Sequence, residues 1–213
     1  MRLGEVAVAL ALVAGCKSEG EIAYERAQSA KQACVAGEGP RCADACAHNI
    51  MLDGPDERRE VCGRACKGGA AESCQTLGRL YDAKDAQALP FFEQGCKLGS
   101  GPACTDAGDL VNDTSPGEAG KLRTRALWAE GCEKGSDRGC LRAGRLLMLQ
   151  KKDSEAAAML KKCWRKQPDG SVGLRPDTNC DDAYRCASGE HIDGVKLDDD
   201  ERKVACRAAF TER

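Results

Sequence analysis

Apolar side chains recur every three or four positions through most of the chain, which is the spacing of amphipathic helices. Between Cys74 and Tyr81, for example, Leu77, Leu80 and Tyr81 fall on one helical face. The sequence therefore predicts an all-α protein built from short consecutive helices. The same pattern recurs at 88–96, 126–132, 140–147 and 156–164.

Four pairs of cysteines share one interval of eight residues, and each pair lies between two of the predicted helices. Successive pairs start 32, 30 and 36 residues apart. A period in this range is typical of stacked helical hairpins. The four pairs are Cys34/Cys42, Cys66/Cys74, Cys96/Cys104 and Cys132/Cys140.

The interval itself indicates how each pair is bonded. Eight residues along one helix rise about 12 Å, whereas the Cα atoms of bridged cysteines lie within about 7 Å of each other. The two cysteines of a pair therefore cannot share one helix and still form a disulfide. One or more glycines follow the first cysteine of every pair, as Gly99 and Gly101 follow Cys96, and glycine commonly ends a helix. We expect each disulfide to staple the end of one helix to the start of the next.

The N-terminus contains ten uncharged residues from Val6 to Gly15, too short a run to span a bilayer but long enough for a signal peptide. The segment Leu12–Cys16 resembles a bacterial lipobox, in which the cysteine is lipidated and becomes the new N-terminus. We expect 1–15 to be a signal peptide, Cys16 to carry the lipid and 16–19 to form a tether. A plain signal peptide is the alternative. Lys17, in place of a retention aspartate, favours an outer-membrane lipoprotein that faces the periplasm or the cell surface.

The composition supports an exported chain with many disulfides. The 213 residues include 15 cysteines, whereas only 4% are aromatic. Setting Cys16 aside leaves an even fourteen, as expected for disulfides in an exported protein. The net charge of −2 lacks the basic excess of nucleic-acid-binding proteins. The only membrane contact we expect is the N-terminal lipid.

The repeated units resemble Sel1-like repeats, relatives of the tetratricopeptide repeat, most closely in Ser73–Leu110. The disulfide-stapled subgroup, of which the Helicobacter cysteine-rich proteins are an example, is the most similar. The resemblance covers 20–165 and implies an α/α superhelix, a solenoid of Sel1-like helical hairpins. It departs from the family where Asp82–Asp85 and Asn112–Gly120 replace the usual glycine-rich link.

The remaining cysteines extend this scheme. Cys163 has its nearest partner at Cys180, across an inserted loop at 166–179, and Cys46 and Cys62 lie equally far from Gly54. Cys186 and Cys206 would join a C-terminal hairpin cap at 180–213. An alternative is open, because 42–66 is similar to the twin CX3C hairpin of small mitochondrial Tim chaperones, which would pair Cys42 with Cys66.

Catalytic and metal-binding patterns are missing from the sequence. His48 and His191 lack the spacing of metal ligands, and the cysteines lack the tight spacing of zinc knuckles. No serine–lysine pair of the Ser-x-x-Lys type is present, so we name no catalytic residue and no cofactor. The resemblance still leaves a weak penicillin-binding or β-lactamase-type hydrolase as an alternative, and a thiol-redox module as another.

Two further clusters have structural interpretations. The acidic run at 198–201 lacks the spacing of a calcium loop and would instead complement the dipole of the last helix. Trp128 and Trp164 lie one period apart and are expected to pack between repeats.

Without a catalytic or metal-binding pattern, the sequence favours a surface that binds an unidentified protein or peptide. The predicted function is therefore that of an interaction scaffold or adaptor in the cell envelope. Solenoids of helical hairpins bind partners on the face formed by the first helix of each hairpin. The candidate contact residues are the polar positions on those helices, Gln75, Arg79, Asp82, Asp106, Arg142 and Arg145.

Overall fold

The structure of the chain is a computed structural model that describes most of residues 18–210. The expected signal peptide, Cys16, Trp164, His191 and most of the expected loop at 166–179 lie outside the described residues. The described ranges are 18–37, 39–48, 52–82, 84–163, 165–166, 172–173, 180–190 and 196–210.

Eleven α-helices follow one another through the described residues, together with two short 3-10 helices and a two-stranded ribbon. Their bounds are α1 (Glu19–Val35), α2 (Gly39–Ala47), α3 (Pro55–Lys67), α4 (Ala71–Arg79), η2 (Ala86–Ala88), α5 (Leu89–Lys97), α6 (Gly101–Thr114), α7 (Glu118–Glu133), α8 (Asp137–Leu149), α9 (Asp153–Leu160), η3 (Lys161–Cys163), β1 (Arg165–Lys166), β2 (Val172–Gly173), α10 (Cys180–Ser188) and α11 (Asp199–Phe210).

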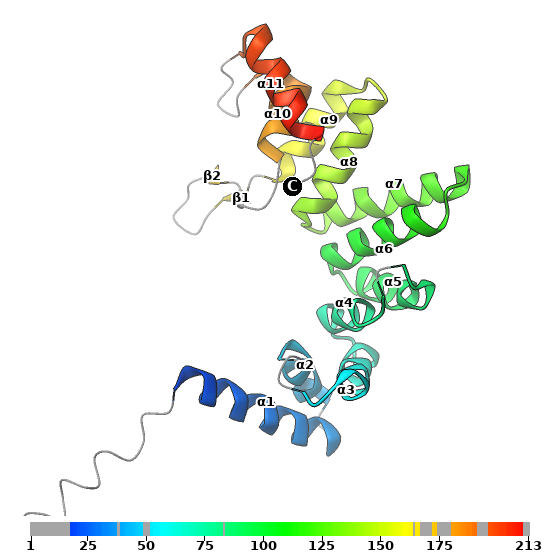
Figure 1. Ribbon diagram of the computed structural model, residues 1–213, viewed down its shortest axis with the longest axis vertical. Helices are drawn as coiled ribbons and strands as arrows, with labels where there is room; N and C mark the ends of the chain where they lie inside the picture. Colours follow the sequence, from blue (N-terminus) through cyan, green and yellow to red (C-terminus); the bar gives the residue numbers. More distant parts are fainter. Residues whose placement is uncertain are drawn as a thin grey trace, which may run out of the picture.

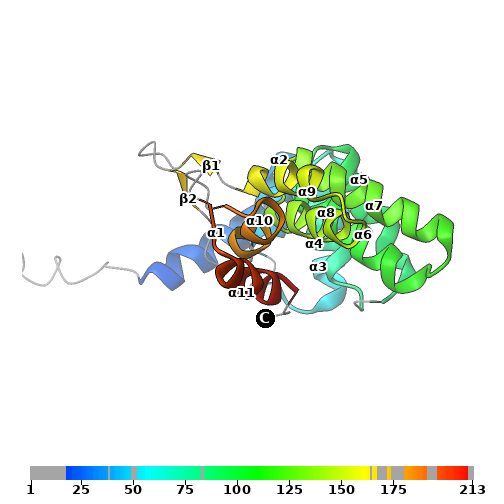
Figure 2. The same ribbon diagram turned by 90° about the horizontal axis from the view of Figure 1, so that it is seen from above.

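The helices form a curved array in sequence order, from α1 at one end to α11 at the other (Figure 1). Each helix packs mainly on its neighbours in the chain, and α6 also contacts α4 and α8. Helix α1 and the β1–β2 ribbon project to one side, whereas the long α6–α7 hairpin projects to the other (Figures 1 and 2). The predicted all-α solenoid is confirmed. Within the described residues, no helix is long and apolar enough to cross a membrane.

Seven disulfides staple this array, and the cysteine pairs are those proposed from the sequence. We call α2, α4, α6, α8 and α10 the first helices of their hairpins, and α3, α5, α7, α9 and α11 the second helices. Because Cys42 is bonded to Cys34 and Cys66 to Cys74, the twin CX3C pairing is wrong. The bonds are Cys34–Cys42, Cys46–Cys62, Cys66–Cys74, Cys96–Cys104, Cys132–Cys140, Cys163–Cys180 and Cys186–Cys206.

Each eight-residue staple spans a tight turn, with Cα atoms only 4.4–4.6 Å apart. In the turn after Cys96, Gly99 adopts a positive φ of 103° and its amide donates to the Cys96 carbonyl. The Ser100 hydroxyl then accepts from the Ala103 amide and caps α6. Glycines with positive φ also occupy the third position after the first cysteine in the other three staples, at Gly37, Gly69 and Gly135.

Glycines in the first helices receive large side chains from the second helices. A Cβ atom on Gly78 of α4 would lie 2.5 Å from the Phe92 ring of α5. The same contact joins Gly108 to Trp128 and Gly144 to Leu160 in the next two hairpins. Trp128 is buried in this way, and the Arg142 guanidinium of α8 lies 5.9 Å from its ring centroid.

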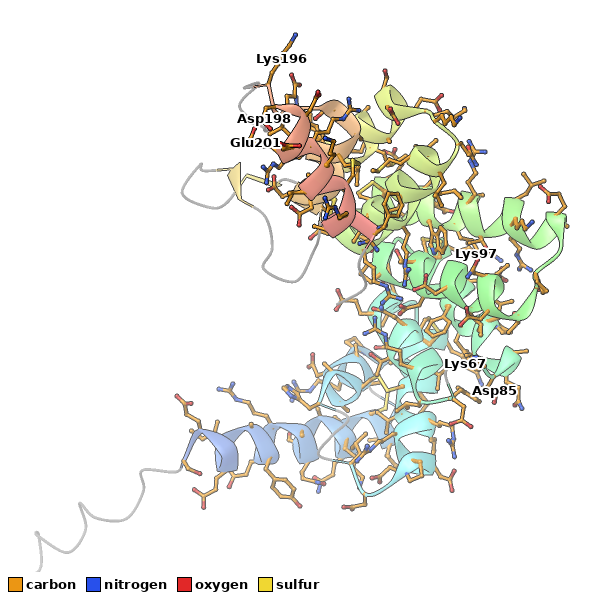
Figure 3. All side chains as sticks on the ribbon, turned by 45° about the horizontal axis from the view of Figure 1, so that its top comes forward. Lys67, Asp85, Lys97, Lys196, Asp198 and Glu201 are labelled. Atoms are coloured by element: carbon orange, nitrogen blue, oxygen red, sulfur yellow. A yellow bond between two sulfur atoms is a disulfide. The ribbon has the colours of Figure 1, made fainter. Side chains whose placement is uncertain are left out.

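The C-terminal part of the chain closes the array. A disulfide joins α10 to α11, and α10 packs on α8 and α9. Strands β1 and β2 form a short antiparallel ribbon within the inserted segment. Asp198 caps α11, because its carboxylate accepts from the Glu201 amide at 2.8 Å while the Glu201 carboxylate accepts from the Asp198 amide at 3.0 Å (Figure 3). The acidic run therefore includes a helix cap.

Candidate partner-binding site

Polar side chains from three successive first helices meet along the array. Gln75 and Arg79 lie one turn apart on α4, and Asp106 and Asp109 lie one turn apart on α6. Arg138 lies in the first turn of α8. Residues three or four apart share a helical face, and α6 contacts both α4 and α8. The three helices therefore bring carboxylates on α6 between cations on either side. We call Gln75, Arg79, Asp106, Asp109, Arg138 and Arg142 the polar ladder.

Asp106 is the centre of the polar ladder. Its carboxylate accepts a hydrogen bond from Gln75 Nε2 at 2.7 Å and one from Arg79 Nε at 2.9 Å. Arg138 approaches its other oxygen to 3.2 Å. Only 8% of the Asp106 side chain is exposed, so these partners replace the water that a buried carboxylate needs.

Asp109 repeats this arrangement one turn further along α6. Its Oδ1 atom accepts from Trp128 Nε1 at 2.9 Å and lies 3.6 Å from Arg142 Nε. Its Oδ2 atom accepts from Arg138. The same carboxylate thus ties α6 to the second helix of its own hairpin and to the first helix of the next.

The charges of the polar ladder stabilise one another. Burial alone would lower the pKa of Arg138, but hydrogen bonds and Coulombic attraction from Asp109 and Asp106 outweigh burial and raise that pKa. The polar ladder fixes the register of α4, α6 and α8 and leaves only part of its surface free for a partner.

Two of the predicted contact residues are therefore corrected. Gln75 and Asp106 were expected at exposed positions, but both are buried because α6 is packed between α4 and α8. Arg79 and Asp82 are exposed, and Arg142 and Arg145 are half-buried. The structure brings Gln75, Arg79, Asp106 and Arg142 into the polar ladder.

Asp109 and Arg138 are part of the polar ladder but escaped the sequence analysis. The spacing of opposite charges in the sequence could have revealed them, because Arg138 follows Asp106 by 32 residues and Arg142 follows Asp109 by 33. Opposite charges one period apart on adjacent first helices are expected to face each other when the helices stack.

An open groove of 310 Å³ lies beside the polar ladder, between α4 and α6. Phe92 and Leu110 form its apolar part, with Gly78 and Tyr81 alongside. Asp82 lies three residues beyond the end of α4 rather than on that helix, and it is exposed at the rim of the groove, as is Asp113 near the end of α6. We call this the α4–α6 groove.

One group of side chains among the described residues has the spacing of a metal site. Sulfur atoms of Cys96 and Cys104 and a carboxylate oxygen of Glu130 lie within 4.8 Å of one another. Both sulfurs are consumed in a disulfide, so neither offers the thiolate that binds metals. Glu130 is also paired with Lys134 Nζ at 2.6 Å. In the oxidised chain this group is therefore a disulfide next to an ion pair and has no thiolate ligand for a metal ion.

Neither a scan against protein-family models nor a search of curated proteins finds a match to this chain. The resemblance to Sel1-like repeats therefore rests on the residues and spacings that carry it.

Proposed function

We propose that the chain is an exported, lipid-anchored Sel1-like scaffold or adaptor that holds a protein partner in the bacterial cell envelope. The observation that carries this proposal is the open face beside the polar ladder. Disulfides and ion pairs hold α4, α6 and α8 in a fixed register, and an accessible groove lies between two of these helices. A rigid, preformed surface lowers the entropic cost of binding a partner.

The cysteine chemistry supports an envelope location. Disulfides persist in oxidising compartments and are rare in the bacterial cytosol, so the seven bonds indicate an extracytoplasmic protein. The finer assignment, an outer-membrane lipoprotein attached through Cys16, rests on the lipobox resemblance and on Lys17.

Site-specific photo-crosslinking in intact cells tests the scaffold. A photoreactive phenylalanine analogue in place of Tyr81 lies in the lining of the α4–α6 groove, whereas the same amino acid in place of Lys97 is exposed outside it (Figure 3). We expect the Tyr81 position to yield a discrete crosslinked protein and the Lys97 position to yield none. Identical products from both positions, or none from the Tyr81 position, would count against binding at this face.

The lipid anchor has its own test. The wild-type chain should partition into the detergent phase and incorporate labelled fatty acid, while Cys16→Ser should do neither. If the variant remains equally membrane-bound, the anchor lies elsewhere and the lipoprotein assignment is wrong.

A further inference from the structure

The α4–α6 groove has an apolar floor that is held in place. Phe92 and Leu110 are only 7% and 3% exposed. Both belong to one buried apolar cluster, and the contacts in that cluster fix their positions. Tyr81 is half-buried, and its ring stacks on Phe91 with centroids 5.5 Å apart. A volume of 310 Å³ is at the lower end of ligand pockets, about 300–1,000 Å³. The groove is thus suited to one long side chain of a partner and too small for a folded element.

The groove also carries an excess of negative charge. Four carboxylates and two guanidinium groups line it, which leaves a net charge of −2. Of the four carboxylates, Asp106 and Asp109 are already paired with the two lining guanidinium groups, those of Arg79 and Arg138. The excess therefore resides on the remaining two carboxylates, Asp82 and Asp113.

Asp82 and Asp113 are available to a partner. Both side chains are exposed, and neither forms an ion pair or a hydrogen bond to any other residue in the part of the chain that the structure describes. They lie at the rim of the same groove, Asp82 beyond the end of α4 and Asp113 near the end of α6. Carboxylates beside an apolar, low-dielectric wall attract cations more strongly than carboxylates on an open surface do.

Two further grooves lined by described residues lack this combination. A groove of 540 Å³ between α1 and α2 is lined by two carboxylates, Glu25 and Asp44, and two guanidinium groups, Arg26 and Arg41, so its charges balance. A groove of 550 Å³ between α2 and α4 also has two carboxylates in its lining, Asp44 and Glu72, but the other lining residues are alanines, a serine and a threonine, so it has no aromatic floor. An aromatic floor and unpaired carboxylates coincide at the α4–α6 groove.

We propose that the α4–α6 groove binds a lysine or arginine side chain presented by an extended segment of the partner protein. The aliphatic stem of such a side chain packs over Phe92 and Leu110, as long cationic side chains do on apolar surfaces. Its cationic head then donates charge-assisted hydrogen bonds to the carboxylates of Asp82 and Asp113. This inference rests on the proposed scaffold function and adds the chemistry of the segment that the groove recognises.

A displayed library of random twelve-residue peptides tests the inference with the oxidised full chain as bait. Peptides enriched on the wild-type protein should share a lysine or arginine at one position. The double variant Asp82→Asn, Asp113→Asn should bind a synthetic enriched peptide about tenfold or more weakly, as expected when charge-assisted hydrogen bonds are lost. Replacing the shared cation by glutamine in the peptide should have the same effect.

A matched double variant controls for the change in net charge. Asp56→Asn with Asp200→Asn also removes two carboxylates, whose side chains are 93% and 90% exposed and lie on α3 and α11. It should bind the peptide as the wild type does. Circular dichroism should show the helical content of the wild type for both double variants, because all four side chains are exposed.

The outcomes separate this inference from the function on which it rests. Enriched peptides without a shared cation, or with binding unchanged by the Asp82/Asp113 variant, would overturn the cationic groove while leaving the scaffold function intact. A library that yields no enriched peptide would also overturn it, and the crosslink from the Tyr81 position in cells would still decide the scaffold function.

Discussion

Single small residues set the distance between helices in this array. Gly78, Gly108 and Gly144 each receive a large side chain from the second helix of the hairpin. Gly95 of α5 lies against both α4 and α6, and Gly131 brings α7 close to α6. Close-packed interiors leave no room for an added methyl group at such contacts. The positions of these glycines therefore define the repeat as much as the positions of the cysteines do.

Replacing Gly78 by alanine should destabilise the chain. The new Cβ would lie 2.5 Å from Phe92 Cε1, so the ring must move, at a cost of about 1–3 kcal/mol. Gly63→Ala is the matched control, since the nearest atom to its Cβ is 3.9 Å away in Leu77 and alanine is the better helix former by about 1 kcal/mol. Urea unfolding with intact disulfides should show opposite signs for the two variants. Equal stabilities would contradict the packing of α4 on α5.

The sequence predicted which helices carry several residues of the polar ladder, but not how deeply each residue is buried. Helical periodicity placed Gln75, Arg79 and Asp106 on first helices, and all three belong to the polar ladder. It could not reveal that α6 is packed between α4 and α8, which buries Gln75 and Asp106. Burial depends on the distance between helices of different hairpins, and that distance is set by the glycine contacts, which periodicity does not report.

At the scale of elements, the turn inside each staple determines how one hairpin follows another. The eight-residue interval predicted a helix end, a turn and a new helix, and all four staples have that form. The glycine at the third position after the first cysteine is the residue that allows it, because its φ is positive in every case. Glycine has no Cβ atom and accepts positive φ, whereas L-amino acids are strained in this region of backbone conformation.

Gly99→Ala should accordingly destabilise the α5–α6 turn by about 1–2 kcal/mol. No atom lies within 4 Å of a Cβ atom added at this position, so the loss would be due to backbone strain alone. Gly99→Asn should lose less, because asparagine tolerates positive φ better than alanine does. Urea unfolding of the two variants provides the comparison, and an alanine variant as stable as the wild type would rule out the strained turn.

A second pair of elements, α1 and α3, is joined by an ion pair that responds to pH. Lys31 Nζ lies 2.5 Å from the Glu57 carboxylate, which also accepts from the Asp53 amide at 2.6 Å. The hydrogen bond from Lys31, followed by that from Asp53, lowers the pKa of Glu57 below its ordinary value. The resulting stability is fully present above the unfolded-state pKa, about 4.3, and is lost as pH falls through the lower, folded-state pKa.

Glu57→Gln should therefore be less stable than the wild type near neutral pH by a few tenths of a kcal/mol, as expected for a pair that water still reaches. The difference should shrink as pH falls below about 4.3. Urea unfolding across this range measures it. Glu60→Gln is the control, because Glu60 pairs with Arg64 on its own helix. A difference between wild type and Glu57→Gln that does not change with pH would contradict this role of the carboxylate.

At the scale of the whole molecule, covalent staples compensate for a core with few aromatic residues. Alanines and cysteines account for much of the buried apolar surface, and each short disulfide loop contributes about 2–3 kcal/mol in chain-entropy terms. The array therefore depends on its bonds more than a solenoid with a large aromatic core would. The all-α array and the staples could be predicted from the sequence because one interval repeats, whereas the identity of the partner has no comparable periodic signal.

The fold, the extracytoplasmic location and the α4–α6 groove all depend on the same cysteine pairing. A disulfide map of the exported protein tests that pairing most directly, by alkylating free thiols, digesting without reduction at acidic pH and identifying the linked peptides by mass spectrometry. We predict seven linked pairs, four of them at the eight-residue interval, and no free thiol from Cys34 onward. A Cys42–Cys66 link, or two or more free thiols among these residues, would contradict the stapled array.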